Sequence, residues 1–203
     1  MSVLRKWFGP SRDEVWRQLS TEIQGRYVDG GFWTGDKVEA THGEWTLTLD
    51  TYHVHTGKVV IVFTRMRAPY VNPGAFRFTI YRKSVFSGLG KIFGMQDIEV
   101  GDPAFDHDFI IKGTDEAVVR RLFRNARLRQ LLSEQPEVKL RVKDDEGYFG
   151  PSFPEGVDEL EFAVTGVIKD VARLKQVYEL FAETLDELCR MGAAYERDPR
   201  VQL

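Results

Sequence analysis

His53 and His55 stand two residues apart in a segment whose residues alternate as in a β-strand. Side chains at this spacing point to the same side of a strand, so both imidazoles could bind one metal ion such as zinc. A catalytic zinc site needs a third protein ligand, which His42 or Glu44 could supply from near the other end of the strand. The pair also lies beside a predicted hairpin turn, where histidines are often simply solvated. One hypothesis is therefore a metal-dependent enzyme that uses His53 and His55.

Three glycines in the stretch FSGLGKIFGMQD raise the question of a phosphate-binding loop. Their spacing, G-x-G-x-x-x-G, differs from the dinucleotide-binding pattern, and the residue after Lys91 is not the Ser or Thr that a P-loop requires. The apolar residues of the stretch instead fall near one face of a helix. We therefore expect a short amphipathic connector that covers the sheet, with contact to a membrane surface or a partner groove as the alternative.

A histidine between two carboxylates occurs in the stretch FDHDF, residues 105–109. Such a setting could raise the proton affinity of His107 or bind a cation. The preceding Asp102-Pro103 indicates a turn, so we expect an exposed loop here. The single cysteine, Cys189, falls among core positions of a predicted helix and is interpreted as a packing residue. No hydrolase or metalloprotease motif is present, so we expect no enzyme and no cofactor.

The basic residues are unevenly distributed, although the net charge of the chain is only −3. The span from Lys58 to Gln96 contains no Asp or Glu. If its cations converge on one face, they form a patch that attracts phosphates or anionic lipid. The alternative is that they pair with acidic residues elsewhere, such as those near residue 145. The acidic total and the lack of a recognition motif argue against nucleic acid. The candidate anion-binding residues are Arg65, Arg67, Arg77, Arg82, Lys83 and Lys91.

Composition indicates an ordinary soluble domain. The chain has 203 residues, of which 42% are apolar, and its one cysteine excludes an intramolecular disulfide. The strongest apolar run, VVIVF, is far shorter than a bilayer-spanning helix, and the N-terminus has no signal-peptide pattern. These features predict a soluble, cytoplasmic protein without a transmembrane segment.

The elements that must position these residues can be read from the periodicity. A capping box at Ser11 and Glu14 begins a helix, several alternating segments predict strands, and Asp170 caps a long final helix that stops at Gly192. This order predicts an α+β fold, in which helices pack on a curved, mainly antiparallel sheet. A PH-like or helix-grip, partly closed barrel is the alternative. We expect a single domain over residues 1–192 and a flexible tail over residues 193–203.

Nearly the whole chain resembles a family of uncharacterised bacterial proteins, a domain of unknown function. The resemblance runs from about Phe8 to Gly192. It rests on the stretches FGPSRDEVW, GGFWTGDKV, TRMRAPY, FRFTIYRK, GMQDIEVGDPAFDHDFIIKG and VKDDEGYFG. It implies a bacterial, cytoplasmic domain and supplies no activity, cofactor or catalytic residue. The predicted element order also resembles secretion-chaperone-like architectures, which dimerise and hold partner segments.

Three functional hypotheses follow. The first is a non-enzymatic interaction or binding domain, whose partner is a second copy of the chain or another protein. The second is a peripheral binder of an anionic membrane surface or a phosphate-bearing ligand through the basic region of residues 58–91. The third is the metal-dependent enzyme built on His53 and His55.

Overall fold

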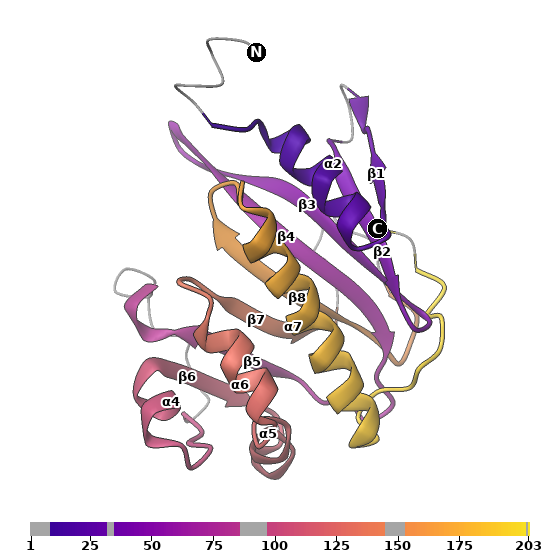
Figure 1. The fold of residues 1–203 in the computed structure, drawn as a ribbon. Coiled ribbons are helices and arrows are strands. Elements are labelled where there is room, and N and C mark those ends of the chain that lie inside the picture. Colours follow the sequence, from indigo (N-terminus) through magenta and orange to yellow (C-terminus); the bar gives the residue numbers. More distant parts are fainter. Residues whose placement is uncertain (1–8, 32–34, 86–96, 145–152, 202) are drawn as a thin grey trace.

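The computed structural model describes residues 9–31, 35–85, 97–144, 153–201 and 203, and Figure 1 shows their arrangement. The described strands form one eight-stranded antiparallel sheet in the order β1-β2-β3-β4-β8-β7-β5-β6. The strands are β1 (Arg26–Val28), β2 (Lys37–His42), β3 (Trp45–Thr56), β4 (Val59–Val71), β5 (Phe78–Arg82), β6 (Phe109–Gly113), β7 (Lys139–Lys143) and β8 (Val157–Thr165).

The first four strands form a meander, because each pairs antiparallel with the next one along the chain. The longest pair is the β3–β4 hairpin, whose register runs from Thr48 opposite Arg67 to Thr56 opposite Val59. Its turn is made by Gly57 and Lys58, and Gly57 has a φ of 60°, a conformation that costs glycine little. The predicted turn at this position is therefore confirmed.

The helices pack on one face of the sheet (Figure 1). Side-chain caps begin the main ones: Ser11 forms the predicted capping box with Glu14, and Asn125 and Asp170 each accept a hydrogen bond from a first-turn N–H. The described helices are α2 (Arg12–Glu22), the 3₁₀ turn η1 (Lys83–Val85), α4 (Pro103–Asp108), α5 (Glu116–Leu122), α6 (Ala126–Ser133) and α7 (Val171–Arg190).

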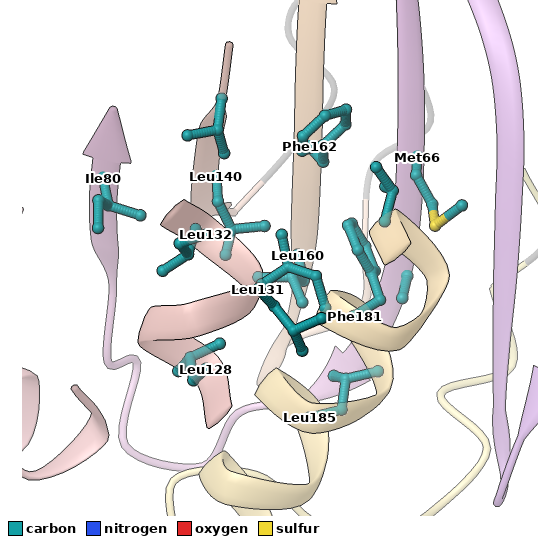
Figure 2. Packing of buried hydrophobic residues seen from close by; sticks show 14 of the residues in the cluster. Met66, Ile80, Leu128, Leu131, Leu132, Leu140, Leu160, Phe162, Phe181 and Leu185 are labelled. Carbon is teal, nitrogen blue, oxygen red and sulfur yellow. The ribbon is translucent and has the colours of Figure 1, made fainter. Parts of the chain in front are cut away.

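The hydrophobic core lies between these helices and the sheet. Strand β8 is its centre, since Leu160 and Phe162 are fully buried beneath α6 and α7. Trp16 of α2 and Phe181 of α7 are also fully buried in the same cluster. Figure 2 shows part of this packing, with Leu128, Leu131 and Leu132 of α6 and Phe181 and Leu185 of α7 facing Leu140, Leu160 and Phe162 of the sheet.

The observed architecture confirms the predicted α+β class, with an N-terminal helix and a long C-terminal helix on an antiparallel sheet. The sheet of described strands is open rather than closed into a PH-like or helix-grip barrel, because β1 and β6 form its two ends and do not pair with each other. The predicted connector at residues 86–96 lies outside the described residues.

One local prediction was wrong. The expected loop at residues 105–109 is partly helix: Asp102 caps α4, Pro103 occupies its first turn, and Phe105 packs into the core. Strand β4 continues through Pro69 to Val71 in register with β8, although proline is unfavourable inside a sheet. In both places a long-range packing partner decides the local structure.

The C-terminal segment, expected to form a flexible tail, packs on the domain. Ala194 is fully buried, and the Tyr195 N–H donates a hydrogen bond of 3.0 Å to the carbonyl oxygen of Val71. Lys37 Nζ donates to the carbonyl oxygen of Leu203 at 2.6 Å. The segment therefore crosses the edge of β4 and reaches β2.

The central position of β8 gives a stability prediction. Replacing Phe162 by Ala should lower the free energy of unfolding by about 3–5 kcal/mol, because it leaves a cavity among side chains that cannot collapse around it. Denaturant unfolding measures this change. Thr165→Ala, at the exposed end of the same strand, is the matched control and should change stability by less than about 0.5 kcal/mol. A loss below about 1 kcal/mol for Phe162→Ala would contradict the assigned core.

Candidate functional site

The sheet face opposite the helices carries a row of alternating charges across its central strands. Side chains alternate between the two faces of a strand, so the residues beside Leu160 and Phe162 in sequence point away from the core. We call this row the charged belt. It consists of Asp50 of β3, Arg65 and Arg67 of β4, Glu159 and Glu161 of β8, and Arg141 and Lys143 of β7.

One half of the charged belt is centred on Asp50. Arg65 donates two hydrogen bonds to its carboxylate, from Nε at 2.9 Å and from Nη2 at 3.0 Å. Arg67 also donates to Asp50. Two guanidinium groups therefore neutralise a single carboxylate, and the side chains of all three residues are at most 15% exposed.

The other half is centred on the two glutamates of β8. Arg141 Nε donates to Glu161 at 2.7 Å, and Lys143 Nζ donates to the same carboxylate at 2.8 Å. Lys143 Nζ also lies 3.1 Å from Glu159, whose exposed fraction is zero. The two halves adjoin, because Arg67 is directly opposite Glu161 in the register of β4 and β8.

Burial and the charges of the belt shift the pKa values of its member Glu161 and of two residues nearby. Burial of Glu161 by itself would raise the pKa of this carboxyl, but Arg141 and Lys143 outweigh burial and the pKa is lowered. Burial and then the neighbouring cation Arg141 lower the pKa of Lys139. Burial also raises the pKa of the Tyr52 phenol. The glutamate is thus held as an anion, which suits it to neutralise cations rather than to exchange protons near neutral pH.

The C-terminal segment covers one side of this face. Val201 and Leu203 border a hollow of about 360 Å³ together with Thr48, Pro69 and Lys37. The hollow lies on the β2–β4 side of the belt, since Pro69 is opposite the buried Glu159 in register. Its lining is mixed in charge, so it favours no ligand of one sign.

Beyond the belt, the β3–β4 hairpin leaves the sheet. We call residues 51–63 the ribbon. The last pair between β2 and β3 is Val38 with Leu49, and the last regular pair between β4 and β8 is Thr64 with Val164. A single bridge joins Phe63 to Gly166 beyond that point. Among the described strands, the ribbon is therefore paired only with itself over most of its length (Figure 1).

The ribbon exposes apolar side chains to solvent. Val54, Val59 and Val60 are 38%, 58% and 52% exposed. In the described part of the chain, the one other large hydrophobic residue with comparable exposure is Tyr195, on the C-terminal segment. Val54 and Val59 share one face of the hairpin and Val60 lies on the other, so these exposed apolar residues gather on one element. Such a gathering is typical of an interaction surface, whereas exposed apolar residues scattered singly are not.

We call residues 54–61 the tip of the ribbon; at its base, ring contacts join the two strands. Tyr52 and Phe63 are cross-strand partners whose rings stack with centroids 5.0 Å apart. The guanidinium of Arg65 lies over the Tyr52 ring, 5.0 Å from its centroid. The belt and the aromatic pair thus hold the ribbon where it leaves the sheet.

The two histidines proposed as metal ligands lie on the ribbon and are exposed. His53 and His55 share one face, as the strand period requires. Their proposed third ligands lie far away, since His42 pairs with Trp45, eight residues and about 26 Å along the strand from His53. His42 is instead bonded to Asp186 at 2.9 Å. No group of three or more potential metal-ligating side chains occurs among the described residues.

The proposed anion-binding residues separate into different environments. Arg65 and Arg67 lie together in the belt. Arg77 contacts Asp144 at 2.9 Å and Asp158 at 3.3 Å, before the start of β5.

Arg82, at the other end of β5, pairs with Asp108 at 3.1 Å and donates to the carbonyl oxygens of Gln135 and Ser133. Lys83 donates to the carbonyl oxygen of Asp106 at 2.9 Å. Lys91 lies outside the described residues. The structure therefore brings two of the six together and gives acidic or carbonyl partners to the five that it describes.

His107 projects from the end of α4 with its side chain 86% exposed. Its Nδ1 lies 3.0 Å from the carboxylate of Asp108. The hydrogen bond from His107, with help from Arg82, lowers the pKa of Asp108. The pair is a surface contact beside α4.

Sequence reasoning missed most of the charged belt, in particular Asp50, Glu159 and Glu161. A signal was available in the segments DELEFAV and KLRVK, where charged residues alternate with large apolar ones. Such alternation predicts a charged face but not its pairing. The pairing depends on β8 lying between β4 and β7, which sequence order does not indicate.

Comparisons with known proteins add a likeness of fold. No family model matches the chain, and no curated protein matches it. The crystal structure of the mycobacterial trehalose monomycolate transport factor A, TtfA, matches with a TM-score of 0.51 and 11% sequence identity, over 94% of this chain and 98% of that one. At this identity the match shows the fold alone. No helix among the described residues is long and apolar enough to cross a bilayer.

The lowered pKa of Glu161 predicts a pH-dependent stability. Glu161→Gln should lower the free energy of unfolding at pH 7 by about 1.5–3 kcal/mol, because the two cations lose an ionised acceptor. A lowered folded-state pKa stabilises the fold above the ordinary value of 4.5, and this contribution is lost as the pH falls through the folded-state pKa. The difference between wild type and variant should therefore shrink below that pH.

Denaturant unfolding at a series of pH values measures this effect. The matched control is Glu155→Gln, an exposed glutamate just before β8, which should leave the pH profile unchanged. A Glu161→Gln profile parallel to that of the wild type at every pH would show that the belt does not hold Glu161 ionised.

Proposed function

We propose that this protein is a non-enzymatic binding domain that engages its partner through the ribbon. The observation that carries the proposal is the group of exposed valines, Val54, Val59 and Val60, on a hairpin that extends past its neighbouring strands. Exposed apolar surface is unfavourable in water, and covering it with a partner removes that cost.

The anchoring of the ribbon supports this role. A binding element loses less conformational entropy on association when its base is already ordered. The Tyr52–Phe63 stack and the hydrogen bonds from Arg65 to Asp50 supply that order where the ribbon leaves the sheet. The tip beyond them has no such contacts among the described residues and is available to a partner.

The chemistry of the charged belt also favours binding over catalysis. Its carboxylates face cations at hydrogen-bonding distance, and the pKa of Glu161 is shifted away from neutrality. A general acid or base needs a pKa near the working pH. The shared fold with a protein named as a transport factor agrees with a binding role, although fold by itself does not carry function.

In vivo photo-crosslinking tests the proposal. A photoreactive amino acid at Thr56, on the ribbon tip, should form a discrete adduct in living cells of the source organism. The same group at Lys169, exposed before α7, should form none. Val59→Ser with Val60→Ser should reduce the Thr56 adduct about tenfold, because it removes the apolar side chains that the partner covers.

Mass spectrometry of the adduct would identify its class as a protein, a second copy of the chain or a lipid. Equal labelling from Thr56 and Lys169, or an adduct that is indifferent to the valine substitutions, would overturn the assignment of the ribbon as the binding element.

A further inference from the structure

We infer that the partner of the ribbon is an anionic lipid surface, into which the ribbon tip inserts to the depth of the lipid headgroups. The inference rests on the proposed function, because it names the partner of the same element. Three properties of the tip carry it: its two apolar faces, its charge and its unpaired edges.

Apolar side chains occur on both faces of the ribbon tip. In the hairpin register Val54 pairs with Ile61 and Thr56 with Val59, so these residues share one face. Val60 pairs with His55 and lies on the other face. Val59 and Val60 are each more than half exposed. A flat protein surface would cover one face and leave the other in water, whereas a lipid interface surrounds the tip and covers both.

The charge of this region complements an anionic surface. No Asp or Glu occurs in the ribbon, and Lys58 lies at its turn. The nearest preceding acid, Asp50, is already paired with Arg65 and Arg67. A lysine beside inserted valines can extend its ammonium group to the phosphates while its methylenes stay in the apolar layer. Anionic lipids attract such a cation, and zwitterionic lipids do so much less.

The open edges of the ribbon limit how deeply it can insert. Backbone N–H and C=O groups at an unpaired edge need water or another partner, and hydrocarbon supplies neither. Over residues 59–61 of β4 and 51–56 of β3, the described strands supply no second neighbour. The tip is therefore suited to the hydrated headgroup layer, where the valine side chains reach the acyl boundary and the backbone keeps its water.

Vesicle flotation tests the inference with the full-length protein. The probes are vesicles of phosphatidylcholine alone and vesicles that also contain roughly 30% phosphatidylglycerol. We expect binding to the anionic vesicles at least about tenfold tighter than to the neutral ones, and weaker binding in high salt. Lys58→Glu, and separately Val59→Ser with Val60→Ser, should each weaken binding about tenfold.

Matched controls make the same chemical changes elsewhere. Lys169→Glu reverses an exposed lysine before α7, and Tyr195→Ser removes an apolar side chain that is 54% exposed. Both should bind as the wild type does, within about twofold. Thermal unfolding checks that every variant is folded.

A readout that leaves the valines and lysine intact uses a fluorophore at the tip. In a Cys189→Ser background, Thr56→Cys carries an environment-sensitive dye, whose emission should shift to the blue on anionic vesicles only. The same dye on Lys169→Cys should not shift.

The outcomes separate this inference from the proposed function. A Thr56 adduct to a protein in cells, without binding to anionic vesicles, would overturn the lipid assignment and leave the ribbon as a binding element. Absence of both would overturn both. Equal binding to the two vesicle types, or binding that survives the Lys58 and valine substitutions, would also overturn the inference.

Discussion

The insertion of β8 between β4 and β7 is the constraint on which the rest of the structure depends. β8 joins the N-terminal meander, β1 to β4, to the other three strands, β7, β5 and β6. Being central, it is buried on both faces from Val157 to Val164. On the face toward the helices the buried side chains are apolar: Leu160 and Phe162 pack against α6 and α7.

On the opposite face the same burial removes Glu159 and Glu161 from water. A buried carboxylate is unfavourable unless cations lie close to it. Arg141 contacts Glu161, and Lys143 contacts Glu159, from the neighbouring strand β7. The position of β8 therefore explains the charged belt, and the charges on neighbouring strands follow from it.

The belt also marks where the covered sheet ends and the ribbon begins. Arg65 is paired on both sides, with Asp50 of β3 and Ala163 of β8. Beyond Leu49 of β3 and Thr64 of β4, the two strands pair almost entirely with each other. At the base Asp50 pairs with Arg65 and Arg67, and at the tip apolar side chains are exposed. In the proposed function, the belt contributes to stability and the ribbon contacts the partner.

The sequence by itself determined the features that depend on neighbours along the chain. The capping box at Ser11, the cap at Asp170 and the Gly57–Lys58 turn are set by hydrogen bonds and backbone preferences within a few residues. The α+β class was predictable as well, because helical and strand periodicities are also visible within short segments of the chain. The sequence also shows that residues 58–96 contain no Asp or Glu, but it does not show which acids their cations contact.

Only the tertiary structure decided which charges pair and which apolar residues stay exposed. Arg67 meets Asp50 across one hairpin, while Arg141 meets Glu161 because two strands far apart in the sequence are neighbours. The run VVIVF is apolar throughout, yet Val59 and Val60 are exposed because β8 ends before reaching them. Burial and pairing are properties of strand order and strand length in space, and these are fixed by long-range packing that no local pattern encodes.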